Sequence, residues 1–65
     1  MITIDSINRF NNSLTIMALS TDIKPIKTVE YKKVKYEVEN GSTFYEMDTK
    51  KAFMYDEENH VWHDV

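Results

Sequence analysis

The last third of the chain, residues 40–65, is a series of short aromatic segments separated by turn-forming residues. It holds five of the eight aromatic residues, namely Phe44, Tyr45, Phe53, Tyr55 and Trp62. Aromatic and β-branched residues favour strands, whereas Gly, Asn, Asp and Ser favour the turns between strands. The segment therefore predicts an antiparallel meander with apolar side chains on both faces.

The strongest turn signal is the Asn-Gly dipeptide at residues 40–41. Two-residue Asn-Gly loops favour the type I′ hairpin turn, because both central residues need positive φ. In that register Lys35 faces Glu46 and Lys33 faces Asp48, two pairs of opposite charge that would stabilise a hairpin. One face would then carry Val34, Tyr36, Val38, Tyr45 and Met47, and the other Lys33, Lys35, Glu37, Glu46 and Phe44.

Two further turns are expected, at residues 48–51 and 56–59. Across the first of them, Met47 is expected to pair with Ala52. The length of the second loop decides the position of Trp62, because a shift by one residue moves a side chain to the other face of a sheet. An odd loop places Trp62 on the opposite face, and an even loop places it with Phe44, Phe53 and Tyr55.

The N-terminal segments are less regular. Alternation at the start of the chain favours a short strand, and a helical turn within residues 5–12, capped by Asp5 or Ser6, is the alternative. Residues 13–20 have apolar side chains at both odd and even positions. They fit either a strand covered on both sides or a short buried helix.

The middle of the chain is a loop followed by extended segments. Residues 20–25 are expected to form the loop, because Pro25 lacks an N–H group and restricts Lys24 to extended geometry. Apolar and polar residues alternate over residues 26–39, but the apolar positions change from odd to even numbers at residues 32–33. This change indicates a bulge or a break between two strands. The chain is thus expected to be a single all-β domain over residues 1–65, a small antiparallel meander or sandwich of about five to six short strands.

Size and composition limit what can support such a domain. A chain of 65 residues buries only about 60% of its unfolded surface, so its core is small. With no cysteine there is no disulfide and no thiolate metal site, and the two histidines lack the spaced partners of a zinc site. No cofactor is expected. Self-association is the remaining support, so a second copy is an expected partner.

Charge and hydropathy exclude other partners. The formal net charge of -3 argues against a nucleic-acid binder, which normally carries a basic surplus. No apolar run approaches the ~20 residues of a membrane-spanning helix, and the start of the chain lacks the basic and apolar regions of a signal peptide. A cytoplasmic location is expected.

No motif in the chain predicts catalysis. His60 and His63 lie near acidic residues, but an i, i+3 pair on a strand points to opposite faces. The serines and threonines lack a nucleophile motif such as Gly-x-Ser-x-Gly, and one glycine cannot form a phosphate-binding loop. The chain is expected not to be an enzyme.

The aromatic side chains allow two interpretations. In the first they are core, with Tyr36, Tyr45 and Met54 on the inner face. In the second they form an interface, since Trp and Tyr are enriched at binding hot spots. A face with several aromatic rings needs a cover, either the first forty residues or another subunit. The candidate interface residues are Phe44, Phe53, Tyr55, Trp62 and Tyr31.

The chain also carries a longer pattern. It consists of Ser-Thr-Asp-Ile-Lys-Pro at residues 20–25, Gly-Ser at 41–42, Glu-Met-Asp-Thr at 46–49, Tyr-Asp at 55–56, and Trp62. This pattern resembles a cassette in small proteins of bacteriophages and prophages. It departs from that cassette in two ways: Lys50-Lys51 stands where a Gly often follows the Thr, and the spacer before Gly41 is long and strand-like.

The resemblance implies a small phage-type protein, and the small core favours one that acts by protein–protein interaction. The first hypothesis is a self-associating, virion-associated structural module that docks on a larger phage protein. The alternative is a soluble phage inhibitor, of the anti-defence type, that binds and blocks a host protein. Acidity favours the alternative, because an acidic surface can occupy a nucleic-acid site. The expected locations are the host cytoplasm, or the virion after assembly.

Overall fold

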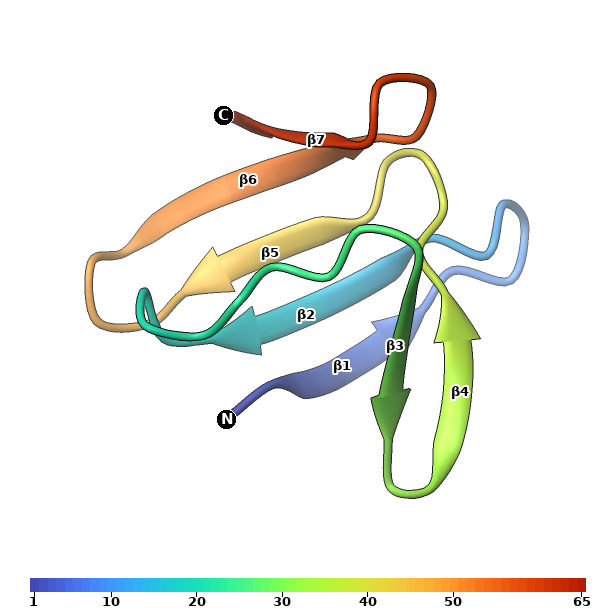
Figure 1. Ribbon diagram of the computed structural model, residues 1–65, viewed down its shortest axis with the longest axis horizontal. Coiled ribbons are helices and arrows are strands. Elements are labelled where there is room, and N and C mark those ends of the chain that lie inside the picture. Colours follow the sequence, from blue (N-terminus) through green and yellow to red (C-terminus); the bar gives the residue numbers. More distant parts are fainter.

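The computed structural model describes residues 1–65, and the fold is all-β (Figure 1). Neither segment for which a helix was the alternative is helical, since both contain a strand. The strands are β1 (Thr3–Ile7), β2 (Leu14–Ala18), β3 (Thr28–Tyr31), β4 (Val34–Glu37), β5 (Thr43–Glu46), β6 (Lys51–Asp56) and β7 (Val61–Asp64). The predicted all-β class is confirmed, with seven strands where about five to six were expected. No helix is long and apolar enough to cross a membrane.

The strands form two sheets. The larger has the order β1-β2-β5-β6-β7, and the smaller is the β3–β4 hairpin. β5, β6 and β7 form the predicted antiparallel meander, but β2 and β5 run parallel. A parallel pair needs a crossover connection. Residues 19–42 make this crossover, and the β3–β4 hairpin within it lies in front of one face of the large sheet (Figure 1).

The Asn-Gly turn does not form a hairpin, and the predicted pairs Lys35–Glu46 and Lys33–Asp48 are wrong. β4 and β5, which it connects, lie in different sheets. Gly41 does have the positive φ that its identity predicts, +83°. Its N–H donates to the carbonyl of Tyr55 at 3.2 Å, which ties the turn to β6. Asn40 does not have positive φ, so the predicted type I′ geometry is wrong as well, and the choice of strand partner depends on the rest of the sheet.

A two-residue hairpin turn occurs instead at Lys32 and Lys33, with φ of 51° and 66°. Positive φ at both central residues is what a type I′ turn requires. The turn joins β3 to β4, and Glu30 pairs with Lys35 beside it. The predicted break between two strands at residues 32–33 is therefore confirmed.

The register of the meander differs from the expected one by two residues. Tyr45, not Met47, pairs with Ala52. The chain turns at residues 47–50, where Lys50 adopts a φ of 62°, so β5 ends one residue earlier than expected. The next loop, residues 57–60, has an even number of residues and pairs Tyr55 with Trp62. Trp62 thus lies on the face of Phe44, Phe53 and Tyr55.

The core lies between the large sheet and the crossover. It consists of Leu14, Ile16, Ala18, Val29, Val38, Phe44 and Tyr55. Tyr36 packs against it, but the prediction that Tyr45 and Met54 face inward is wrong, since they are 39% and 45% exposed. Alternation separates the two faces of a strand, but it does not say which face the crossover covers.

Candidate interaction surface

A nearly buried ion pair attaches the crossover to β5. Lys24 Nζ donates to Glu46 Oε2 at 2.7 Å, and Thr49 Oγ1 donates to the other carboxylate oxygen at 2.7 Å. The hydrogen bond from Lys24, followed by that from Thr49, lowers the pKa of the Glu46 carboxyl. The ammonium also lies 4.3 Å from the ring centroid of Phe53, within the range of a cation–π contact.

A second contact joins the start of the crossover to the β5–β6 turn. Asp48 accepts hydrogen bonds from the hydroxyl of Ser20 at 2.6 Å and from its backbone N–H at 2.9 Å. These two bonds are the main reason that the pKa of the Asp48 carboxyl is lowered. Next to them, the N–H of Met47 donates to the carbonyl of Ala18 at 2.8 Å.

Two aromatic side chains anchor the middle of the crossover. Trp62 Nε1 donates to the carbonyl of Pro25 at 2.7 Å, and the Tyr55 hydroxyl donates to the carbonyl of Ile26. The Trp62 ring lies 5.7 Å from the Phe44 ring, edge to face, and 4.9 Å from the Tyr55 ring. Residues 20–25 and the aromatic tail therefore contact each other and hold the crossover on the sheet.

The structure places the five candidate interface residues in different environments. Phe44 and Tyr55 are only 0% and 3% exposed, so these two belong to the core and are not at a surface. Phe53 and Trp62 pack against that core and are partly buried. Tyr31 lies apart from them, at the end of β3. Four of the five aromatic residues do share one face, but the chain's own crossover covers it.

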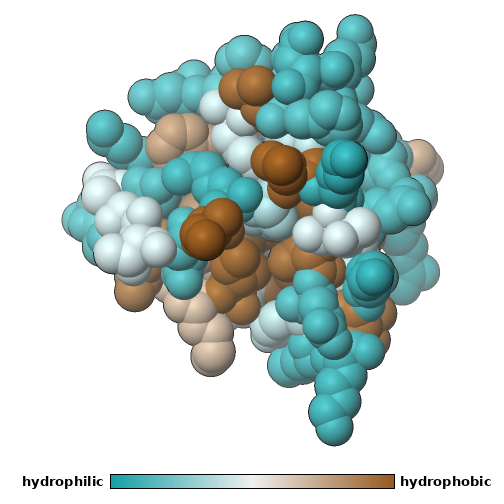
Figure 2. Space-filling model, in the orientation of Figure 1, coloured by the Kyte–Doolittle hydropathy of each residue, from teal (hydrophilic) through white to brown (hydrophobic).

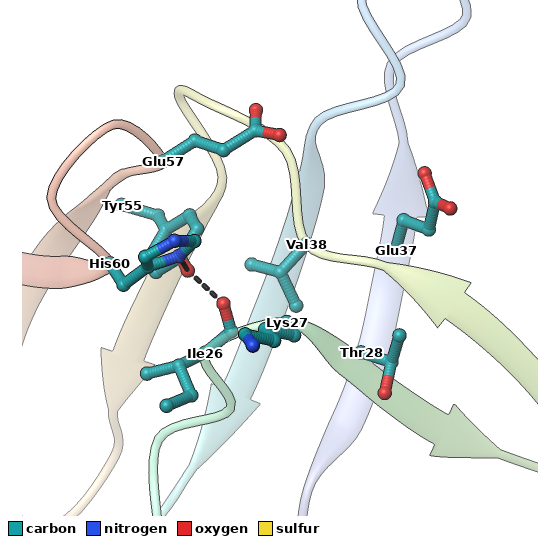
Figure 3. A pocket seen from close by; sticks show the side chains of 8 residues that line it. All are labelled: Ile26, Lys27, Thr28, Glu37, Val38, Tyr55, Glu57 and His60. Atoms are coloured by element: carbon teal, nitrogen blue, oxygen red, sulfur yellow. Dashed lines mark hydrogen bonds between the residues drawn. The ribbon is translucent and has the colours of Figure 1, made fainter.

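A hollow of about 260 Å³ lies between the crossover and the β6–β7 turn (Figure 3). Lys27, Glu57 and His60 are among its lining residues. His60 Nδ1 is 3.3 Å from the Tyr55 hydroxyl, and burial, followed by the charges of Glu57 and Asp56, raises the pKa of Tyr55. Since the Tyr55 proton is already donated to a backbone carbonyl, the hollow offers no activated nucleophile.

The structure also contains no group of three or more His, Asp or Glu residues placed to hold a metal ion. His63 is not part of the hollow: it pairs with Asp56, with 3.1 Å between Nε2 and Oδ2.

The other face of the large sheet has no cover. Cross-strand pairing places Thr15, Thr43, Met54 and His63 in one row and Met17, Tyr45 and Ala52 in the next. We call this surface the outer face, and it consists of Thr3, Ser6, Thr15, Met17, Thr43, Tyr45, Ala52, Met54, Asp56, Val61 and His63. Figure 2 looks onto the opposite, covered side, where the hairpin and crossover present a mostly hydrophilic surface with apolar side chains between them.

The outer face has few charges and several large apolar side chains. Tyr45, Met54 and Val61 are 39%, 45% and 44% exposed. The carboxylate of Asp56 on this face accepts hydrogen bonds from Asn59 and His63, which lower its pKa to about 2. The sequence interpretation missed this surface. The available signal was the alternate positions of β2, β5 and β6, which carry a single charge at Asp56, once the opposite positions are assigned to the core.

Comparisons of the chain with protein-family models, with curated proteins and with solved structures give no match.

Proposed function

We propose that the chain is a non-enzymatic, phage-type protein that acts by protein–protein interaction, as a self-associating structural module of the virion. The observation that supports this proposal is the outer face, an uncovered sheet surface with exposed Tyr45, Met54 and Val61. Interface cores are enriched in Tyr and Met and depleted of charge. The expected interaction surface therefore moves from the aromatic set of Phe44 and Tyr55 to the opposite side of the same sheet.

The test is an affinity pull-down of the tagged chain from infected cells, together with mass spectrometry of purified virions. A Tyr45→Lys/Met54→Lys variant should lose the captured partner, because both lysines would stand in the contact. The matched control is Val34→Lys, which places a charge on an equally exposed apolar residue of the hairpin. Equal capture by both variants would contradict a role for the outer face.

The alternative proposal is a soluble inhibitor that blocks a basic site on a host protein. A group of carboxylates around the Asn-Gly turn favours it. The charge of Glu57 and then burial, followed by contact with Glu37, raise the pKa of Glu39. The negative charge of these carboxylates resembles that of a nucleic-acid backbone, which a basic site would bind. Capture of a host nuclease or helicase by the tagged chain, with no copies in virions, would support this alternative and reject the structural role.

A further inference from the structure

We infer that the outer face packs against the outer face of a second copy, so that two chains form a two-fold, two-layer β-sandwich. This inference rests on the proposed function and names the partner of the same surface. It differs from the sequence interpretation in the face that is used, because the aromatic face of Phe44 and Trp62 is already covered by the crossover.

The shape of the surface favours another sheet as the partner. In a two-layer β fold each sheet buries one face against another layer. Here the crossover and the β3–β4 hairpin form that layer on one side only (Figure 1). Two sheets with the same twist pack face to face at about 10 Å, with their strands rotated by roughly 30°. A second copy presents a surface of the same size and twist, and a two-fold axis lets identical patches meet.

Large and small side chains alternate on the outer face, so it can fit against the outer face of a second copy. β5 is the middle strand of the large sheet, and it carries Tyr45. Tyr45 pairs with Met17 on one side and with Ala52 on the other. A large ring therefore stands beside a small methyl group. In a two-fold arrangement, Tyr45 of each copy fills the space above Ala52 of the other, and the flexible Met17 and Met54 side chains fill the remaining gaps.

Charge also favours a second copy. The chain has a formal net charge of -3, so most contacts between copies would bring like charges together. The outer face carries few charges, and the Asp56 carboxylate on it accepts hydrogen bonds within its own chain, from Asn59 Nδ2 at 2.8 Å and from the N–H of Glu58 at 3.1 Å. Contact through the outer face therefore brings few like charges together, and the hydrogen bonds to Asp56 reduce the cost of desolvating its carboxylate.

The area of the outer face indicates how strongly two copies can associate. Five strands about 4.8 Å apart, with four to six residues of about 3.3 Å each, give a face of roughly 24 by 16 Å. Allowing for side-chain relief, two such faces bury on the order of 1,000 Å² in total, which is the lower limit for a specific interface. The dimer is thus expected to be weak and reversible.

Sedimentation equilibrium over a range of concentrations tests the inference. The unaltered chain should pass from monomer to dimer as its concentration rises. Tyr45→Lys and Ala52→Glu should each shift this transition to at least tenfold higher concentration, and the Val34→Lys control should not. Circular dichroism would verify that each variant keeps the fold, as the partial exposure of Tyr45 leads us to expect.

Spin labels give a second readout, which measures the distance between the two copies instead of their affinity. The chain has no cysteine, so Thr43→Cys and Lys33→Cys each introduce a single labelling site. Across the dimer, labels at residue 43 should lie within about 20 Å of each other, given sheets about 10 Å apart. Labels at residue 33, on the far hairpin, should be much farther apart.

Two results would overturn the inference: a monomer at all concentrations, or a dimer that Tyr45→Lys does not weaken. The proposed function fails differently. It fails when the pull-down captures the same partners with and without the outer-face substitutions. A monomeric chain whose capture of a larger protein still depends on Tyr45 would reject the dimer and retain the function.

Discussion

Phe44 and Tyr45 are consecutive residues of β5 that face opposite sides of the sheet, and their exposed fractions are 0% and 39%. We expect Phe44→Ala to cost about 3–5 kcal/mol of unfolding free energy, because it leaves a cavity beside Trp62 and Ile16. That loss is comparable to the whole stability of many small domains. Tyr45→Ala should cost far less in the monomer. Urea unfolding of dilute samples would measure both, and similar losses would show that the burial of Phe44 is misassigned.

Gly41 has a specific backbone requirement that differs from the one its sequence context suggested. Its φ is +83°, and a Cβ built on it would meet no atom within 4 Å. Gly41→Ala should therefore cost only the backbone strain of an L-residue at positive φ, about 1–2 kcal/mol, and Gly41→Val should cost more. Gly41→Asn is the control, because Asn tolerates this region better. An unfolding temperature of Gly41→Val equal to that of the unaltered chain would contradict the turn geometry.

At the scale of elements, the β3–β4 hairpin is the least supported part of the fold. Its strands pair only with each other, and Val29 is its one buried residue. At the open end of the hairpin the N–H of Val38 donates to the carbonyl of Lys27 at 3.0 Å, which extends the pairing of its own two strands and does not attach them to the large sheet. We therefore expect the hairpin to open at a lower free energy than the large sheet, with faster hydrogen exchange.

The turn of this hairpin offers a stabilising substitution. Lys32 and Lys33 adopt positive φ, for which lysine has no preference. Replacing them by Asn and Gly, the residues that favour a type I′ turn, should raise the unfolding free energy by about 0.5–1 kcal/mol. Lys35→Gly, within β4, should lower it, since Gly weakens strands. Thermal unfolding of the two variants would test this assignment, and a loss of stability in the Asn-Gly variant would argue against the turn.

At the scale of the whole molecule, acidic pH should unfold the protein. The carboxyls of Glu46, Asp48 and Asp22 have lowered pKa values, through hydrogen bonds from Lys24, from Ser20 and from the N-terminal amine, respectively. The pKa of Asp56 falls to about 2. A carboxyl with a lowered pKa in the folded state stabilises that state above its unfolded pKa, and this contribution disappears as pH falls through the folded pKa.

Between pH 7 and about pH 5 stability should therefore change little, and it should decrease progressively from about pH 4 toward pH 2. The unfolding temperature measured from pH 7 to pH 2 would show this. Glu46→Gln should lower that temperature at pH 7 and make the profile flatter, because the variant has lost one of the carboxyls that titrate. A profile of Glu46→Gln parallel to that of the unaltered chain would mean that the Lys24–Glu46 pair does not stabilise the fold.

The sequence alone predicted most of the local structure. β-branched and aromatic residues placed the strands of the C-terminal meander, and the phase change at residues 32–33 located the hairpin turn. Grouping Phe44, Phe53, Tyr55 and Trp62 on one face followed from the period of two, once the loop length was known. These features depend on near neighbours in the chain, which is why they can be read from it.

Only the tertiary structure decided the partners and the covered face. Of Asn40 and Gly41 only Gly41 adopts positive φ, whereas a type I′ hairpin needs it at both, and the parallel pairing of β2 with β5 leaves β4 and β5 in different sheets. The crossover then covered the aromatic face, and it is held there by contacts such as Lys24–Glu46, which join residues 22 positions apart. Since no local pattern encodes such a contact, the sequence could separate two faces of the sheet but could not show that Tyr45 belongs to the free one.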